Sequence, residues 1–345
     1  MINQSDPSTI PAPTNNFWRW PTWNYTNYYD VYCTNGSTVP GEKNYLIGTI
    51  YIIEYLIYVS LYVPSLIVIW RSHLFQHACY KLMFCIGIFD CMGGFIYAFF
   101  AGILSIMGAN YCDNNFIIIL SGHALHGAWG LFCTSAVILA LNRCIDVWSK
   151  NAANALFGGR RVWLWSIPVI TYAVLFSSDY DVPPVYNSVW SCYLFTIDYR
   201  PGAPPVNDWF CFLNSCWVMI ALIILYSLLL LGMWRSKGLV EKNSLRKMQQ
   251  KVLLQSCVIC MSVFLVAFTY ASASFIRIPN QLGKFATIAL QVCSGTTSVV
   301  YLTMNKTIRN GVKQLLGISK GEVHPSKTDK SLGTSAKQTI TDAAV

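Results

Sequence analysis

Two histidines three residues apart, His123 and His126, are the side chains whose spacing suggests metal or acid–base chemistry. On a helix they would share one face. A zinc site needs a third protein ligand and an open position for water, and the sequence places no other histidine at the same depth. We therefore predict no metal, no cofactor and no catalytic residue. Both histidines are expected to line a ligand-binding cavity, with Trp129 and Tyr270 as aromatic neighbours and Gln291 as a further polar group. The alternative is that the two histidines are packing residues.

Two carboxyl groups, Glu54 and Asp90, lie within long apolar stretches. A charge in the middle of a bilayer costs about 3 kcal/mol on insertion scales, so such groups usually face a bundle interior or water. Two interpretations stay open: an ion- or proton-linked switch, and a neutral carboxyl hydrogen-bonded to a neighbouring helix. The second fits Glu54 better, whereas Asp90 is the functional candidate.

A polar stripe runs along the last long apolar stretch. Gln291, Ser294 and Ser298 recur at i, i+3 and i+7, which places them on one face of a helix. The other faces of that helix are apolar and suit lipid. The stripe is therefore predicted to face inward, toward Asp90.

The composition points to a membrane protein. The chain has 345 residues, of which 54% are hydrophobic and only 11% charged, against about 25% charged in soluble domains. The net charge of +9 is carried largely by short connections between apolar segments. This pattern favours membrane topology over nucleic-acid binding, so no nucleic-acid partner is predicted.

Seven apolar segments approach or exceed the roughly 20 residues that a helix needs to cross the hydrocarbon core. They predict an all-α integral membrane protein with a seven-transmembrane helix bundle. The segments are 45–70, 79–107, 116–142, 161–178, 209–234, 252–277 and 284–304.

The distribution of lysine and arginine predicts the orientation. The connection 235–251 holds six basic residues and one acid, and basic loops stay in the cytoplasm. The N-terminus is therefore expected outside and the C-terminus in the cytoplasm. Three N-x-S/T acceptors, Asn3, Asn24 and Asn35, then lie on the outer side.

This orientation divides the chain into four parts. Residues 1–44 are predicted to be an extracellular glycosylated segment, and residues 45–304 the transmembrane domain. Residues 305–317 are predicted to form an amphipathic juxtamembrane helix that lies on anionic membrane lipid. Its apolar face consists of Ile308, Val312, Leu315 and Leu316. Residues 318–345 read as a disordered cytoplasmic tail.

Four cysteines lie at the predicted outer face: Cys33, Cys112, Cys192 and Cys211. Only that oxidising side would let them pair, and four cysteines allow three pairings. A Cys112–Cys192 disulfide would pin the loop 178–208 across the mouth of the bundle. We favour that pair, with Cys33–Cys211 as a second.

The inner end of the third segment carries Asn142 and Arg143, followed by Asp146. A cation at the cytoplasmic boundary sets topology. Residues three apart on a helix can meet, so Asp146 is expected to restrain Arg143 in the resting state.

Together these features resemble a G protein-coupled receptor. More narrowly, CYKLMFCIGIFDCMGG (79–94), ILALNRCIDV (138–147), LFGGRRVWLW (156–165) and VVYLTMNKTIRNGV (299–312) resemble the nematode serpentine chemoreceptors of class T. The resemblance implies a receptor in the plasma membrane of chemosensory neurons or their cilia. Such a receptor binds an external small molecule or odorant and activates a heterotrimeric G protein. It would not be an enzyme.

The sequence departs from the broader rhodopsin-like pattern at several positions. Asn142 stands where an acid usually precedes the arginine, segment 252–277 has no proline, and Thr297-Ser298 replace Asn-Pro, although Tyr301 keeps its place. The resemblance assigns Asn142, Arg143 and Tyr301 to the switch that couples to the G protein. The alternative function is a seven-helix transporter or ligand-gated channel without G protein coupling.

Overall fold

A computed structural model of the chain describes residues 41–112, 115–178, 184–194, 209–236, 257–258, 261, 264–268 and 280–318. Predictions for Asn3, Asn24, Asn35, Cys33 and Tyr270, for most of segment 252–277 and for the tail after 318 lie outside them.

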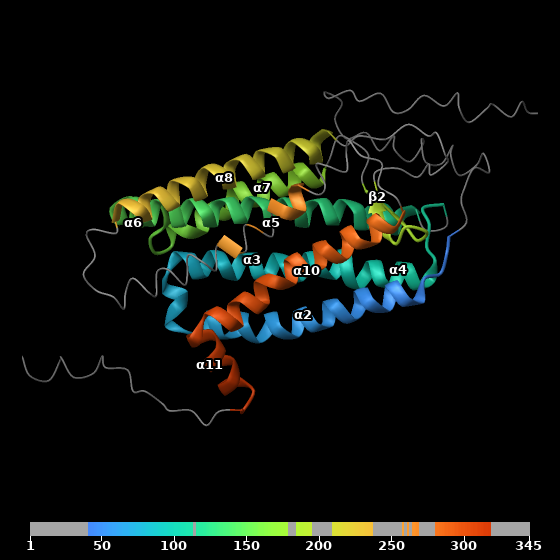
Figure 1. Ribbon diagram of the computed structural model, residues 1–345, viewed down its shortest axis with the longest axis horizontal. Helices are drawn as coiled ribbons and strands as arrows, with labels where there is room; N and C mark the ends of the chain where they lie inside the picture. The colour runs from blue at the N-terminus through green and yellow to red at the C-terminus, as the bar shows by residue number, and fades with distance from the viewer. Residues whose placement is uncertain are drawn as a thin grey trace, which may run out of the picture.

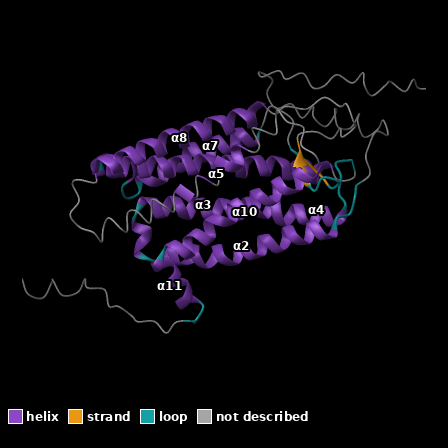
Figure 2. Ribbon diagram, in the orientation of Figure 1, coloured by secondary structure: helices purple, strands orange, loops and turns teal. Residues whose placement is uncertain are grey.

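The described chain is a bundle of long helices with one small hairpin (Figures 1 and 2). The α-helices are α2 (Tyr45–Arg71), α3 (Ala78–Gly94), α4 (Ala101–Met107), α5 (Asn115–Trp148), α6 (Lys150–Phe157), α7 (Ser166–Ser177), α8 (Trp209–Ser236), α10 (Asn280–Met304) and α11 (Lys306–Leu315). Short helical segments are the 3₁₀ turns η2 (His73–Gln76) and η4 (Arg161–Trp165) and the π-helical η3 (Phe95–Phe100). The strands are β1 (Val185–Asn187) and β2 (Cys192–Leu194).

Helix α5 lies at the centre of the bundle, because α3, α7 and α8 all pack against it. Helix α2 packs against α3, α4 and α10. Figure 1 shows the long helices running along one common direction, with the hairpin at one end and α6 and α11 at the other. We call these the hairpin end and the α6 end.

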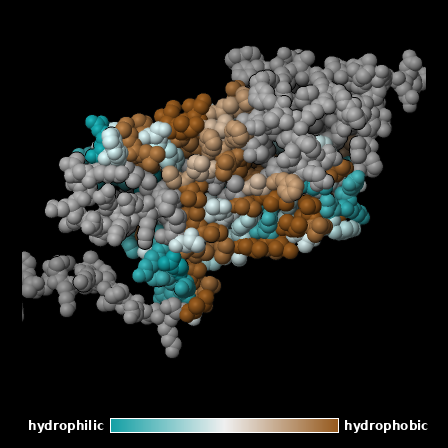
Figure 3. Space-filling view, in the orientation of Figure 1, coloured by the Kyte–Doolittle hydropathy of each residue, from teal (hydrophilic) through white to brown (hydrophobic). Residues whose placement is uncertain are grey.

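Four helical stretches in the described residues are long and apolar enough to cross a membrane: Tyr45–Arg71, Ala78–Met107, Phe116–Trp148 and Phe210–Gly232. In the most apolar windows of the first and last, only 22% and 28% of the residues are buried within the protein. A soluble protein would hide such helices, so their exposed faces suit lipid. Figure 3 shows this as brown surface along the middle of the visible face, with teal residues toward its ends.

The observed boundaries refine the predicted segments. Helix α5 continues to Trp148, beyond the predicted end at 142, so Arg143 and Asp146 belong to the same continuous helix. The predicted helix 161–178 begins with the 3₁₀ turn η4 before α7. Helix α10 begins at Asn280, four residues before the predicted start at 284.

The amphipathic helix α11 packs differently from the prediction. Asn305 caps its N-terminus by accepting hydrogen bonds from the backbone N–H groups of Thr307 and Ile308. Ile308 and Val312, expected to face lipid, are buried in the main core, and α11 packs on α2. Leu315 and Leu316 remain exposed. The apolar face is therefore divided between the bundle and the membrane side.

Candidate functional site

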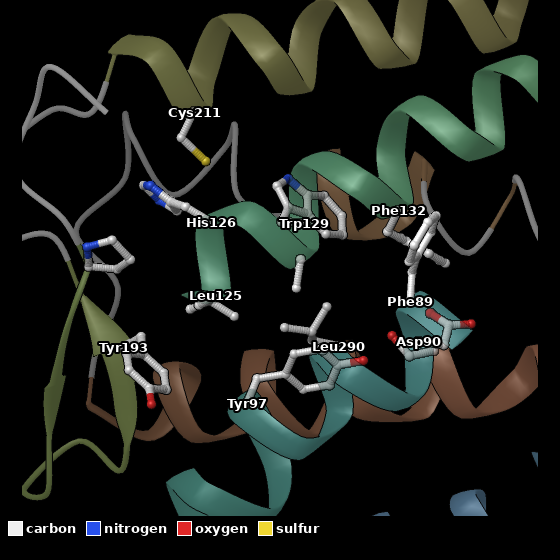
Figure 4. Close-up of a pocket in the computed structure, with 14 residues that line it drawn as sticks. Phe89, Asp90, Tyr97, Leu125, His126, Trp129, Phe132, Tyr193, Cys211 and Leu290 are labelled. Carbon is white, nitrogen blue, oxygen red and sulfur yellow. The ribbon is translucent and has the colours of Figure 1, made fainter. Parts of the chain in front are cut away.

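A cavity with an empty volume of about 620 Å³, its open mouth included, lies between α3, η3, α5, α8, α10 and the hairpin region (Figure 4). The lining is largely apolar and aromatic, with a few polar groups. It consists of Phe89, Asp90, Gly93, Tyr97, Leu125, His126, Ala128, Trp129, Phe132, Pro184, Tyr193, Cys211, Leu290 and Ser294.

One face of α5 forms a long wall of this cavity. His126, Trp129 and Phe132 follow one another at intervals of three residues, so they lie along one side of the helix. Figure 4 shows Trp129 between His126 and Phe132 on this wall. His126 is 3% exposed, and its ring packs against Phe176 of α7 with the centroids 5.0 Å apart.

The hairpin region closes over the cavity because α5 carries a glycine beneath it. A Cβ atom on Gly122 would lie 1.9 Å from the carbonyl oxygen of Pro184, so only glycine permits this contact. Pro184 and Tyr193 both line the cavity. The close approach therefore brings two lining residues onto α5.

Hydrogen bonds tie the hairpin to the helices beneath it. The Tyr51 hydroxyl donates to the carbonyl of Ser191 at 2.9 Å, and the Ser105 hydroxyl donates to that of Ser191 at 3.1 Å. The backbone N–H of Glu42 donates to the Ser188 hydroxyl at 3.1 Å. The hairpin is thereby fixed to α2, to α4 and to the chain before α2.

Both predicted disulfide pairings are wrong. Cys112 is part of a disulfide, but Cys192 and Cys211 are both thiols, so neither can be its partner or that of Cys33. Cys192 is buried in β2, opposite Asn187. The hairpin is held by packing and by the hydrogen bonds to Ser188 and Ser191, so a disulfide at Cys192 is not needed to pin it.

Burial also controls the chemistry of Cys192. Loss of solvent around the side chain raises the pKa of the thiol to about 12, although the charge of Lys284 acts in the opposite direction. At neutral pH the sulfur is therefore protonated, and a protonated thiol is a poor nucleophile.

Asp90 lies at one end of the cavity and is 5% exposed. The Tyr62 hydroxyl of α2 donates to Asp90 Oδ2, and the same hydroxyl oxygen lies 3.1 Å from the Ser294 carbonyl oxygen of α10. The carboxyl thus joins α2, α3 and α10. No ion pair to Asp90 is found among the residues that the structure describes.

The polar stripe of α10 faces inward, as its spacing predicts. Gln291, Ser294 and Ser298 are all buried, with exposures of 1%, 6% and 0%. Ser294 shares the large cavity with Asp90. The Ser298 hydroxyl instead donates to its own helix, at the Gly295 carbonyl.

A second, smaller cavity with an empty volume of about 290 Å³ adjoins the first. Asp90, Tyr97 and Ser294 line both cavities. Gln291, predicted for the ligand cavity, lines only the second. Its Nε2 donates to the Tyr97 carbonyl at 3.1 Å. Tyr97 lies in the π-helical η3, where widened hydrogen bonding is often associated with functional sites, so Gln291 supports the backbone that positions Tyr97.

Of the other predicted cavity residues, Trp129 lines the large cavity but His123 does not. His123 Nδ1 lies 2.7 Å from the Ser177 carbonyl oxygen, and the Ser177 hydroxyl donates to the His123 carbonyl at 2.9 Å. His123 therefore ties α5 to α7. Glu54 lines neither cavity and is partly exposed on α2.

Several lining residues were missed by sequence reasoning. Phe132 continues the three-residue spacing of His126 and Trp129, so that spacing could have identified it. Tyr62 belongs to no such spacing pattern, because the sequence around a tyrosine in an apolar helix does not indicate whether its side chain faces the core or lipid. The other missed aromatic residues are Phe89, Tyr97 and Tyr193.

The α6 end holds the predicted switch residues. Arg143 is 15% exposed, and its Nη2 donates to the Asn142 side-chain oxygen at 3.2 Å. Its Nη1 lies 3.7 Å from Asp146 Oδ2, with the Asp146 side chain 45% exposed. Asn142 thus holds the guanidinium through a neutral hydrogen bond where an acid would form an ion pair.

Tyr301 is fully buried between the helices. Its hydroxyl donates to the Met83 carbonyl of α3 at 2.8 Å, and its ring meets Tyr62 edge to face at 6.1 Å. Tyr301 therefore connects α10 to the same tyrosine that binds Asp90. In the described part of the chain, no three His, Cys, Asp or Glu side chains form a group that could hold a metal ion.

Comparison with known proteins identifies the family. Residues 16–324 match the family described as the serpentine type 7TM GPCR chemoreceptor Srt, which is most of the chain. The chain belongs to the Srt family. It is therefore a multi-pass membrane protein of a seven-span receptor family, and that family is one of receptors, not of enzymes.

A curated relative supports the same assignment. The chain is 23% identical over 256 residues to the serpentine receptor class T-55 of Caenorhabditis elegans. The alignment covers 70% of this chain and 66% of the relative, just under two thirds of its length. The family resemblance inferred from the four sequence motifs is thereby confirmed.

The state of Cys192 can be tested chemically. If the purified receptor is denatured without reductant and alkylated, we expect Cys192 to be labelled and Cys112 to be protected, because Cys112 is in a disulfide and Cys192 is a thiol. Peptide mass spectrometry measures both positions. In the native state at neutral pH, Cys192 should resist alkylation because it is buried and protonated. Labelling of Cys192 only after reduction would contradict the assignment.

The hydrogen bond between Tyr62 and Asp90 can be tested by a double-mutant cycle. Tyr62→Phe should lower the free energy of unfolding by about 1–3 kcal/mol, because a buried carboxyl loses its hydrogen-bond donor. In an Asp90→Ala background the same substitution should have a smaller effect, since the group that needed the donor is absent. Thermal unfolding of the purified variants gives the four values. Equal effects in both backgrounds would show that the two side chains are not coupled.

Proposed function

We propose that this chain is a chemosensory receptor that binds an external small molecule in the large cavity and activates a heterotrimeric G protein. The observation that carries the proposal is the cavity itself, formed at the hairpin side of a membrane bundle whose family consists of chemoreceptors. We place the receptor in the plasma membrane of chemosensory neurons or their cilia.

The distribution of charge supports an orientation with the hairpin outside. The α6 end gathers most lysine and arginine side chains of the described helices: Arg71, Lys81, Arg143, Lys150, Arg160, Arg161, Arg235, Lys306, Arg309 and Lys313. At the hairpin end the described chain has Lys43 and Lys284. Basic residues stay on the cytoplasmic side during insertion. Under this proposal Asn3, Asn24 and Asn35 are glycosylated outside, and the C-terminal tail is cytoplasmic.

Helix α5 connects the cavity to the cytoplasmic side. It carries Trp129 in the cavity wall and Arg143 fourteen residues later, about 21 Å along a helix. A ligand that favours one position of this wall would favour the matching position of Arg143. The ligand can shift the equilibrium between the resting and active states only by the difference between its binding free energies for these two states.

A ligand screen tests the function. Cells expressing the wild type and Arg143→Ala are exposed to volatile and water-soluble cues while second messengers and membrane currents are recorded. We expect a cue that raises second messengers in the wild type and loses most of this response in Arg143→Ala at equal surface expression. Cue-dependent currents that persist without any G protein would instead indicate the alternative, a channel without G protein coupling.

The contact of Arg143 with Asp146 predicts a small change in ligand-free signalling. Arg143 is largely buried but Asp146 is exposed and the two atoms are 3.7 Å apart, so we assign the pair about 0.5 kcal/mol, as for surface ion pairs. This corresponds to roughly a twofold change in an equilibrium. Asp146→Asn should therefore raise basal second-messenger production by about twofold. Asn142→Asp is the matched variant, and it should lower basal signalling because it adds an ion pair to the guanidinium. Unchanged basal signalling in both variants at equal surface expression would remove Asp146 and Asn142 from the switch.

A further inference from the structure

Asp90 is a buried acid at the end of an aromatic cavity, and its surroundings define a ligand chemistry. The carboxyl is 5% exposed and accepts a hydrogen bond from the neutral Tyr62 hydroxyl. Within the described residues it has no ion-pair partner. An acid at this depth can avoid an unpaired charge in two ways: it can hold a proton, or it can pair with a cation. Among the described residues that line the large cavity there is no lysine or arginine that could serve as the cation.

The walls around this carboxyl are aromatic. Figure 4 shows Asp90 beside Phe89 and Phe132, with the hydroxyl of Tyr97 directed along the cavity toward it and Trp129 farther along the opposite wall. Aromatic faces attract organic cations by about 0.5–2 kcal/mol each, and more when water is excluded. A carboxyl surrounded by aromatic rings is the arrangement that an ammonium group recognises.

The same walls disfavour an inorganic ion in the large cavity. Hard metal cations need several oxygen ligands arranged around them, whereas most of this lining is hydrocarbon and aromatic carbon. An organic ammonium ion carries its own apolar body, which can bury against Trp129, Phe132 and Leu290. The lining runs from Asp90 to Tyr193 of the hairpin, as Figure 4 shows, so the apolar body would extend from the carboxyl toward the hairpin end.

We infer that the large cavity binds a small organic cation, an amine or a quaternary ammonium compound, whose charged group pairs with the Asp90 carboxyl between Phe89, Tyr97 and Phe132. The inference specifies the ligand class of the receptor proposed above and rests on that proposal for its biological meaning. Ligand binding does not require signalling, so an experiment can contradict the inferred ligand class without contradicting the proposed receptor function, and the converse also holds.

The test is ligand-induced thermal stabilisation of the purified full-length receptor. The organic probes are matched by shape: 2-phenylethylamine and its N,N,N-trimethyl derivative as cations, 2-phenylethanol as the neutral analogue and 3-phenylpropionate as the anion. Sodium chloride is compared with potassium chloride at constant ionic strength. We expect the two ammonium compounds to raise the unfolding temperature and the alcohol and carboxylate to have little effect. Asp90→Asn should weaken ammonium binding by about 100-fold or more, because a buried ion pair is lost.

Glu54→Gln is the control, because it removes a second intramembrane carboxyl that lines neither cavity. It should keep the ammonium response of the wild type. If Asp90→Asn does not fold, the comparison of amine with alcohol on the wild type still decides the question.

Three results would overturn the inference: equal stabilisation by the alcohol, an ammonium response that survives Asp90→Asn, and stabilisation by sodium alone. Ammonium binding without second-messenger signalling would instead contradict the proposed receptor function and leave the site assignment standing. Signalling by neutral cues without ammonium binding would contradict the inferred ligand class and leave the proposed receptor function standing.

Discussion

The hydrogen bond from Tyr62 to the buried Asp90 carboxyl is the contact on which the middle of the bundle depends. It brings together α2, α3 and α10, and Asp90 lines both the large and the small cavity. Tyr301 packs on the same Tyr62 ring and binds the α3 backbone at Met83. Tyr62 contacts both Asp90 and Tyr301. A change in the position of Asp90 can therefore displace Tyr301 and, with it, α10 and α3.

Two further constraints shape the cavity. The hairpin is fixed by the hydrogen bonds of Tyr51 and Ser105 to Ser191, and Gly122 lets Pro184 rest on α5. On the opposite side, Gln291 binds the Tyr97 carbonyl within the π-helical η3. The backbone at Pro184 and Tyr97, two residues that line the large cavity, is thus positioned by these contacts.

Sequence reasoning predicted those features that depend on local pattern. Apolar length identified the described spans, and the three- and four-residue spacing of Gln291, Ser294 and Ser298 identified the inward face of α10. Sequence reasoning failed for features that depend on which residues from distant parts of the chain lie close together in the fold. Cys192 could not be distinguished from other outer cysteines by position alone, and His123 lies about 60° around α5 from His126, which is enough to direct it toward α7. The contact of Tyr62 with Asp90 has no periodic signature at all.

The central claim is that an external small molecule occupies the large cavity and thereby engages a G protein at the α6 end. A structure of the receptor bound to an activating cue and a heterotrimeric G protein tests it most directly. The proposal predicts ligand density between Asp90 and Tyr193, along the wall formed by His126, Trp129 and Phe132, with the G protein in contact with Arg143. An empty cavity, with the cue bound elsewhere or the α6 end free of the G protein, would contradict it.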